Sequence, residues 1–262
     1  MHHHRRRLIP ALLAALALGA LGAASAQADS YVALGDSYSS GTGTRDYSYD
    51  SACQRGPYAY PALIDADRPN TTLTFKACSG AKTGDVLANQ VQALSAGTTI
   101  VTITIGGNDA GFSSVITQCA LPWPFSCDGD ITTAQNYIRN TLPAKLDSVY
   151  SAIRSRAPSA TVVVLGYPRL FMGVDCNAGT FFSSSELTKL NTTADILRDT
   201  TKARAQAAAF TFKDAIPAFT GHAVCSSTEW LNGLSNPVGD SYHPNRNGHK
   251  LGYEPLVRAV IG

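Results

Sequence analysis

Several features are missing from this 262-residue sequence, and each absence argues against a class of protein. There is no internal repeat, low-complexity tract or linker-like segment, which argues against solenoids and multi-domain arrays. There is no C-x-x-C or C-x-x-x-x-C spacing, which disfavours a structural zinc site. There is no stripe of Lys and Arg and no RNA-binding aromatic signature, so we expect no nucleic-acid partner. Histidine is also scarce: beyond residue 4 the chain has only His222, His243 and His249.

The N-terminus is predicted to be a leader. Arg5-Arg6-Arg7 precede an apolar run over residues 8–24, and small residues before positions 26 and 28 offer a cleavage site. We therefore expect residues 1–28 to be a signal peptide, residues 29–262 to be a single domain, and the protein to be secreted to the extracellular space. A membrane anchor over the apolar run is the alternative, and the arginines leave both Sec and Tat export open.

The net positive charge of the full chain comes from the predicted leader. Of 21 basic and 19 acidic residues, three basic and no acidic ones lie within residues 1–28, so the net charge falls from +2 to −1 on cleavage. The remaining 234 residues are enough for one domain with a substantial core.

Six cysteines follow the leader, and an even number in an exported chain is typical of disulfides. Fifteen pairings are possible. Cys119 and Cys127 enclose a short segment and are expected to pair locally. For the rest we predict sequential pairing, Cys53 with Cys78 and Cys176 with Cys225. Zinc binding is the competing interpretation.

Apolar runs alternate with helix-like stretches along the domain. Strands are expected at 31–34, 73–77, 99–105, 161–166 and 210–213, and helices at 58–66, 83–94, 131–157, 184–209 and 246–260. The runs 99–105 and 161–165 are β-branched enough to be central strands of a parallel sheet. Pro143 predicts a start or a bend within the third helix. Strands separated by helices form right-handed βαβ units, so we predict a three-layer α/β/α fold.

A candidate nucleophile stands directly after the first predicted strand. Gly35-Asp36-Ser37 delivers a hydroxyl to the carboxyl edge of the sheet, where α/β proteins bind ligands. A serine hydroxyl needs a base within hydrogen-bond reach and donors for the oxyanion that it creates. Gly-Asp-Ser is also an ordinary turn sequence, so this motif alone does not assign a function. Asp36 is expected to shape the turn through hydrogen bonds to the backbone.

Two oxyanion donors follow the next two strands. Gly80 lies just after the second strand, and Asn108 lies in the Gly-Gly-Asn-Asp segment after the third. A strand order of 2-1-3 would bring both to the crevice that contains Ser37, where the Gly80 N–H and the Asn108 amide can donate to one oxygen.

The base is sought among the three histidines, and His243 is the best placed. It lies in Gly-Asp-Ser-Tyr-His-Pro, directly before the last predicted helix. Asp240, three positions earlier, is the first candidate to bind the second ring nitrogen. The Ser241 backbone carbonyl is the alternative acceptor. His249 is expected on a helix surface and His222 in a loop.

The order of these motifs resembles that of the SGNH hydrolases, also called GDSL esterases and lipases. The matching positions are Ser37, Gly80, Asn108 and His243, and the likeness spans essentially the whole chain after the leader. It is nearest to secreted actinobacterial (Streptomyces-type) lipases with three disulfides. Here Tyr38 replaces the leucine of the eponymous motif. The α/β-hydrolase elbow Gly-x-Ser-x-Gly is not matched, because Ser39 stands where it requires the final glycine.

The resemblance implies a flavodoxin-like five-stranded sheet of order 2-1-3-4-5 and a serine acyl-enzyme mechanism without a metal or organic cofactor. The expected function is a secreted ester hydrolase, a lipase or carboxylesterase acting on small-molecule or lipid esters such as glycerides, with phospholipids as a further candidate substrate. Apolar residues on loops predict an acyl groove or transient contact with a lipid surface, and the alternative is that they seal the core under long loops. They are Leu121, Trp123, Phe125, Phe171, Met172, Phe181 and Phe182. We expect a monomer. A carbohydrate acetylesterase, an acyltransferase and a non-catalytic binding protein remain the alternatives.

Overall fold

The structure is a computed structural model that describes residues 1–2 and 28–262. The predicted signal peptide falls almost wholly on residues 3–27, outside the described part. Among the helices of the described residues, none combines the length and the apolar character needed to span a membrane.

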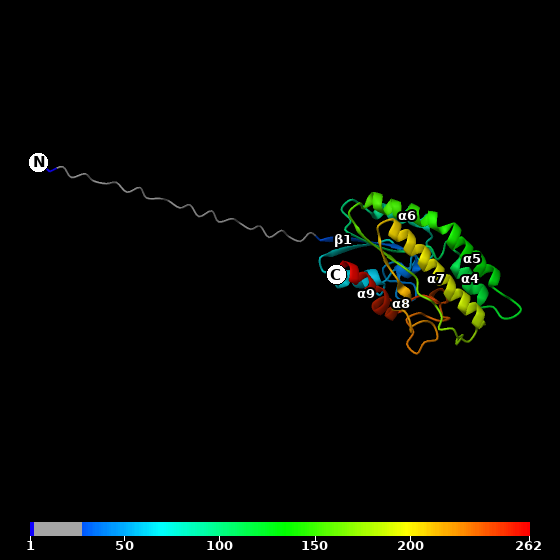
Figure 1. The fold of residues 1–262 in the computed structure, drawn as a ribbon. Helices are drawn as coiled ribbons and strands as arrows, with labels where there is room; N and C mark the ends of the chain where they lie inside the picture. Colours follow the sequence, from blue (N-terminus) through cyan, green and yellow to red (C-terminus); the bar gives the residue numbers. More distant parts are fainter. Residues whose placement is uncertain (3–27) are drawn as a thin grey trace.

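A single parallel sheet forms the middle layer of the fold (Figure 1). Its strands are β1 (Asp29–Gly35), β2 (Thr71–Phe75), β3 (Ile100–Thr104), β4 (Thr161–Leu165) and β5 (Thr211–Lys213). The order is β2-β1-β3-β4-β5, and every pairing is parallel. This confirms the predicted three-layer fold and its strand order. Because Gly35 is in register with Thr104, β1 and β3 end side by side at the carboxyl edge.

Helices cover both faces of the sheet. They are α1 (Ser37–Ser40), α2 (Tyr60–Ala66), α3 (Thr83–Asp85), α4 (Phe112–Cys119), α5 (Asp128–Asn140), α6 (Leu142–Arg156), α7 (Ser184–Ala207), α8 (Ala215–Ala218) and α9 (Glu254–Ile261), with π- or 3₁₀-helical segments η1 (Val86–Gln90), η2 (Val91–Ala93), η3 (Val238–Asp240) and η4 (Gly248–Tyr253). Helix α5 packs against α4, α6 and α7, while α9 packs against α2 and η4 (Figure 1).

The helices differ from the prediction in four places. The predicted helix 83–94 is instead the short α3 followed by the π-helical η1 and the 3₁₀-helical η2. The predicted helix 131–157 is two helices, α5 and α6, because Pro143 lacks an N–H and stands in the first turn of α6, where that loss costs nothing. The last predicted helix divides into η4 and α9, again with a proline, Pro255, in the first turn. Helix α4 forms within a stretch that we predicted to be a loop.

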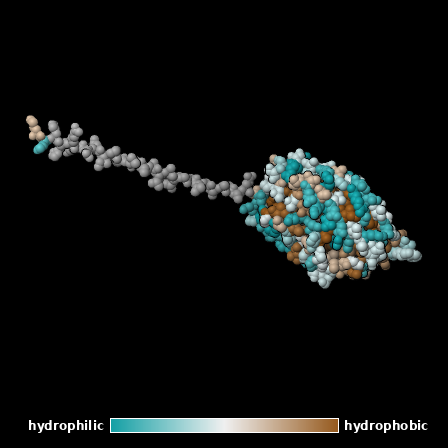
Figure 2. All heavy atoms as spheres, in the orientation of Figure 1, coloured by the Kyte–Doolittle hydropathy of each residue, from teal (hydrophilic) through white to brown (hydrophobic). Residues whose placement is uncertain are grey.

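The core lies between the sheet and its helices. Every residue of β3 is buried, as expected for a central strand whose two faces are both covered. On the face drawn in Figure 2, hydrophilic and hydrophobic residues are interspersed and no broad apolar belt is seen.

All six cysteines form disulfides: Cys53–Cys78, Cys119–Cys127 and Cys176–Cys225. The predicted sequential pairing is therefore confirmed. The zinc alternative is wrong for these cysteines, because a disulfide sulfur is not a thiolate ligand.

Candidate active site

The nucleophile turn is formed by the end of β1 and the four-residue helix α1. Gly35 has φ 122°, and a Cβ there would lie 2.4 Å from the Thr104 carbonyl oxygen, so only glycine fits. The Asp36 carboxylate then accepts a hydrogen bond from the Tyr38 N–H at 3.0 Å and caps α1. This is the turn-shaping contact expected of Asp36, and it presents Ser37 at the first position of the helix.

His243 lies against this serine. Its Nε2 is 2.9 Å from the Ser37 Oγ, and its Nδ1 is 2.9 Å from the Ser241 carbonyl oxygen. A carbonyl can only accept, so Nδ1 carries the proton and Nε2 is left to accept from the serine hydroxyl. Burial lowers the pKa of His243 to about 4, while the Ser241 carbonyl and the Asp240 charge act in the opposite direction. The imidazole is therefore neutral at neutral pH, as a general base must be.

Asp240 does not reach His243. Its carboxylate is buried and accepts a hydrogen bond from the Tyr47 hydroxyl, and the Arg45 Nε lies 3.8 Å away. Of the two acceptors considered for His243, the structure brings the Ser241 carbonyl to Nδ1. Asp240 instead joins the loop after α1 to the segment that carries His243.

The two candidate oxyanion donors lie at the same edge of the sheet as Ser37. Gly80 has φ 80°, and a Cβ there would meet nothing within 4 Å, so the backbone is open to a ligand. The half-buried Asn108 donates through Nδ2 to the Ala81 carbonyl at 3.1 Å. An amide nitrogen has two hydrogens, so a second one remains for a ligand.

Two side chains that were not identified from the sequence, Gln90 and Asp109, hold the backbone at these strand ends. Gln90 accepts from the Gly35 N–H at 2.7 Å and donates to its carbonyl at 2.9 Å. Asp109 accepts from both the N–H and the hydroxyl of Thr83, at 2.9 and 2.6 Å. Asp109 stands beside Asn108 in the sequence, and this position was a local signal for its role. Gln90 offered no such signal.

Tyr167 links the residues that follow β1 to those that follow β3. Its hydroxyl donates to the Asp36 carboxylate and accepts from the Gly107 N–H, the latter at 3.1 Å. Burial raises the pKa of Asp36 to about 7, against the opposing effect of the hydrogen bond from Tyr167. The sequence reading missed Tyr167 as well.

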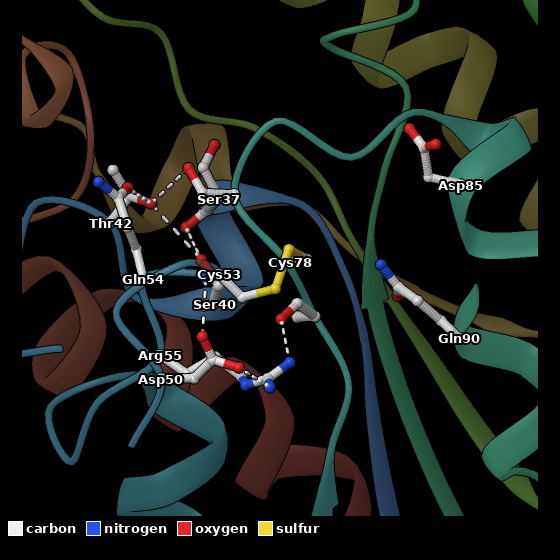
Figure 3. The surroundings of a disulfide bond; sticks show 12 residues. Ser37, Ser40, Thr42, Asp50, Cys53, Gln54, Arg55, Cys78, Asp85 and Gln90 are labelled. Atoms are coloured by element: carbon white, nitrogen blue, oxygen red, sulfur yellow. Dashed lines mark hydrogen bonds and ion pairs between the residues drawn. A yellow bond between two sulfur atoms is a disulfide. The ribbon is translucent and has the colours of Figure 1, made fainter. Parts of the chain in front are cut away.

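The first disulfide supports the Gly80 side of the site. Figure 3 shows Cys53–Cys78 next to the short helix that begins at Ser37. Next to it, the Ser79 N–H donates to the Cys53 carbonyl at 3.0 Å, and the Thr42 hydroxyl contacts the Ser79 hydroxyl at 3.0 Å. The loop that carries Gly80 is therefore held covalently and by hydrogen bonds.

A cavity of about 550 Å³ opens over the candidate residues. Ser37, Asn108 and His243 line its polar part. The other walls are largely apolar, and their contributors are Phe112, Ile116, Leu121, Leu170, Leu197 and Leu234. Two of these come from α4, the helix not predicted from sequence. The cavity combines an apolar chamber with one polar corner, a combination suited to an ester with a hydrocarbon substituent.

The other two histidines lie outside this cavity lining. His249 was predicted on a helix surface, and that prediction is wrong: it is fully buried, and its Nδ1 accepts from the Tyr60 N–H at 3.2 Å. The π-helical turn η4 brings it inward. Burial lowers its pKa to about 3, with a smaller contribution from His243. His222 lies in a loop as expected, stacked on Trp230 at 3.7 Å between ring centroids.

The fold and this geometry define a class: an α/β hydrolytic enzyme with a serine–histidine pair at the carboxyl edge of a 2-1-3-4-5 sheet. Residues 33–251 match the GDSL-like Lipase/Acylhydrolase family. The chain belongs to this family of carboxylic ester hydrolases, and the resemblance read from its motifs is confirmed.

Similar proteins extend over nearly the whole chain. It is 47% identical to a lipase of Streptomyces rimosus over 97% of this chain and 94% of the relative, and 46% identical to Lipase 1 of Streptomyces coelicolor over 98% and 99%. The crystal structure of the extracellular S. rimosus lipase superposes with TM-score 0.84, covering 89% of this chain and all of that one. Phospholipase A1 of Streptomyces albidoflavus, at 44% identity, gives 0.83 over 89% and 99%.

Proposed function

We propose that the protein hydrolyses acyl esters of lipids, glycerides and phospholipids among them, through a covalent acyl-enzyme on Ser37. The observation that carries this proposal is the line of contacts from the Ser37 hydroxyl to His243 Nε2 and from His243 Nδ1 to the Ser241 carbonyl, at the polar corner of an apolar cavity. The similarity to lipases and to a phospholipase A1 supports lipid esters as the substrate class.

The reaction follows from this geometry. The Ser37 oxygen attacks the ester carbonyl while His243 takes its proton, and the resulting oxyanion accepts from the N–H groups of Ser37 and Gly80 and from the Asn108 amide. His243 then gives the proton to the alcohol oxygen as the C–O bond breaks. Water repeats the sequence on the acyl-enzyme and releases the acid. The Ser241 carbonyl holds the imidazole and supports its charged form, and Asp240 does not take part directly.

Replacement of the nucleophile tests this mechanism. Ser37→Ala should abolish turnover of p-nitrophenyl esters and labelling by a fluorophosphonate, with an unchanged circular dichroism spectrum. Ser155→Ala, which removes an exposed serine on α6, should retain both activities. Turnover by Ser37→Ala at the wild-type rate would rule out the assignment.

The substrate class is tested by acyl-chain length. The apolar cavity predicts that kcat/KM rises from acetate to chains of about eight carbons or longer, because each buried methylene contributes about 0.8 kcal/mol. A preference for acetate would instead favour a carbohydrate acetylesterase, and acyl transfer to added alcohols in preference to water would favour an acyltransferase.

We also propose that the enzyme works at a lipid surface. An apolar collar is formed by exposed side chains on loops beside the cavity mouth: Leu121, Trp123, Phe125, Phe181, Leu234 and Val238. Leu121, Leu234 and Val238 also line the cavity, so the collar is continuous with it. Trp123 is 91% exposed on the loop closed by the Cys119–Cys127 disulfide. An aromatic residue so exposed at the entrance suits insertion into the interfacial region of a lipid aggregate.

The collar is tested without touching the cavity lining. Replacing Trp123 and Phe125 together by serine should weaken binding to phosphatidylcholine vesicles by about tenfold or more, while turnover of soluble p-nitrophenyl butyrate stays unchanged. Leu251→Ser, which removes an exposed leucine on η4, is the matched control. Vesicle binding equal to that of the wild type would exclude the collar as the contact surface.

Export and a monomeric state complete the proposal. The similarity to an extracellular lipase supports secretion, with residues 1–28 as the leader. N-terminal sequencing of protein from culture medium should give a start near Asp29, and light scattering should give the mass of one chain.

A further inference from the structure

His243 is supported by a backbone oxygen, so its alignment depends on what holds that backbone. The Ser241 carbonyl is an uncharged main-chain group, so its direction is set by the backbone conformation and not by a side-chain rotamer. The next residue, Tyr242, has φ 60°, a left-handed conformation that costs a bulky residue strain energy and is kept only where its surroundings enforce it. Contacts on the segment 240–243 must therefore supply the precision that a carboxylate gives in a serine triad.

Tyr38 makes such a contact from the nucleophile side. Its hydroxyl donates to the Tyr242 carbonyl oxygen at 2.7 Å. That carbonyl belongs to the peptide bond immediately before His243. A hydrogen bond at this point fixes the plane of the Tyr242–His243 peptide. It thereby orients the His243 side chain, whose ring contacts Ser37 and the Ser241 carbonyl.

The Tyr38 side chain is itself held firmly. The residue is only 7% exposed, and its ring packs edge-on against Tyr167 at 5.0 Å and Tyr253 at 6.4 Å. Its centroid lies 5.4 Å from that of His243. Because Tyr38 follows Ser37 directly in α1, one short helix carries both the nucleophile and a hydroxyl bound to the base segment.

We propose that Tyr38 is a positioning residue for the reaction: its hydroxyl holds the Tyr242–His243 peptide so that the imidazole keeps its contacts with Ser37 and the Ser241 carbonyl. The proposal rests on the proposed role of His243 as the base. Leucine, the residue of the eponymous motif at this position, cannot donate this hydrogen bond. A second contact holds the same segment, because the Tyr47 hydroxyl donates a hydrogen bond to the Asp240 carboxylate.

Removal of one hydroxyl tests the proposal. Tyr38→Phe keeps the ring and should lower kcat about tenfold with KM unchanged, because one lost hydrogen bond loosens the geometry of proton transfer and leaves substrate binding intact. The labelling rate with a fluorophosphonate should fall by a similar factor. Tyr31→Phe is the matched control: its hydroxyl is also buried and hydrogen-bonded, to Thr102 at 2.8 Å within the sheet, and its kcat should stay within about twofold of the wild type.

A donor restored at the same place should restore the rate. With 4-aminophenylalanine at position 38, the ring amine can donate to the Tyr242 carbonyl, and kcat should recover most of the loss. Wild-type kcat in Tyr38→Phe, equal losses in Tyr38→Phe and Tyr31→Phe, or no recovery with the amine would each overturn the proposal. Should Tyr38→Phe fail to fold, the amine variant decides, since it retains both ring and donor. Turnover by Ser37→Ala would instead overturn the catalytic assignment itself, so the two failures are distinguishable.

Discussion

The candidate active site has two halves that are built differently. Ser37, Gly80 and Asn108 follow the ends of parallel strands, and side chains such as Gln90 clamp the backbone there on both its N–H and its carbonyl. His243 lies in a segment between η3 and η4 with almost no regular structure. That segment is held by hydrogen bonds to distant residues, including the one from Tyr38. The sheet positions the first half, and individual side chains position the second.

This difference predicts where substitutions act. In the strand-borne half, each residue supplies its own chemistry, and its removal should cost the free energy of that one interaction. In the loop-borne half, the proposed mechanism assigns the chemistry to His243, and its neighbours are proposed to contribute through alignment. Four experiments test whether the two halves differ in this way, and the substitution with the largest expected loss of activity comes first.

The largest effect is expected for the base. His243→Ala should lower kcat by about 10⁴-fold or more, because His243 Nε2 is the hydrogen-bond partner of the Ser37 Oγ among the described residues. Steady-state kinetics with p-nitrophenyl butyrate measures this, and circular dichroism checks the fold. A loss below about 100-fold would show that another group serves as base.

The strand-borne donor should contribute less. Asn108→Ala should lower kcat by about 10²–10³-fold with little change in KM, the range for one oxyanion donor. The contact from Asn108 to the Ala81 carbonyl is also lost, so a thermal melt must accompany the kinetics. A rise in KM at constant kcat would mean that Asn108 binds the ground state instead of the oxyanion.

A third experiment concerns stability in acid. Burial lowers the pKa of His249 to about 3, so the native state keeps it neutral while the unfolded chain protonates it below about pH 6.5. Below about pH 6.5 the unfolded state therefore binds more protons than the native state. As the pH is lowered to 4, the free energy of unfolding should decrease by up to about 3 kcal/mol from this residue. The pKa of His243 is lowered to about 4, and this residue destabilises the native state in acid in the same way. The pKa of Asp36 is raised to about 7, so its carboxyl binds a proton in the native state at a higher pH than in the unfolded state. Asp36 therefore stabilises the native state as the pH falls, opposite to the two histidines.

His249→Asn isolates this contribution, because the amide oxygen can still accept from the Tyr60 N–H. Urea unfolding between pH 4 and 7 should give a shallower loss of stability in acid than for the wild type. Parallel curves for the two proteins would contradict the buried neutral state of His249.

The smallest effect is expected for Asp240→Asn. In an enzyme whose triad aspartate binds the histidine, replacement of that aspartate by asparagine lowers kcat by about 10⁴-fold. Here the carboxylate accepts a hydrogen bond from the Tyr47 hydroxyl, and the amide oxygen of asparagine can still accept it. We therefore expect kcat to fall by less than about tenfold. A loss near 10⁴-fold would show that Asp240 moves to His243 during the reaction.

Much of the fold was predictable because its signals are local. The five strands follow from apolar runs, of which the two central ones are β-branched, and Pro143 marks the region where α5 gives way to α6. Helix α4 was missed because it is short and its stretch is rich in loop-forming Gly and Ser. His249 was misplaced because a π-helical turn changes which residues face inward, and a reading based on 3.6 residues per turn cannot anticipate this.

The candidate chemical groups can be recognised from residue type and order along the chain: a serine after the first strand, glycine and asparagine after the next two, and a histidine chosen among three. Their order along the chain maps directly onto a parallel sheet, since each strand ends at the same edge. Only the tertiary structure decided which oxygen meets His243 Nδ1. That choice depends on where Tyr47 and Tyr38 lie, 193 and 204 residues from their partners Asp240 and Tyr242, and no local pattern records such a distance.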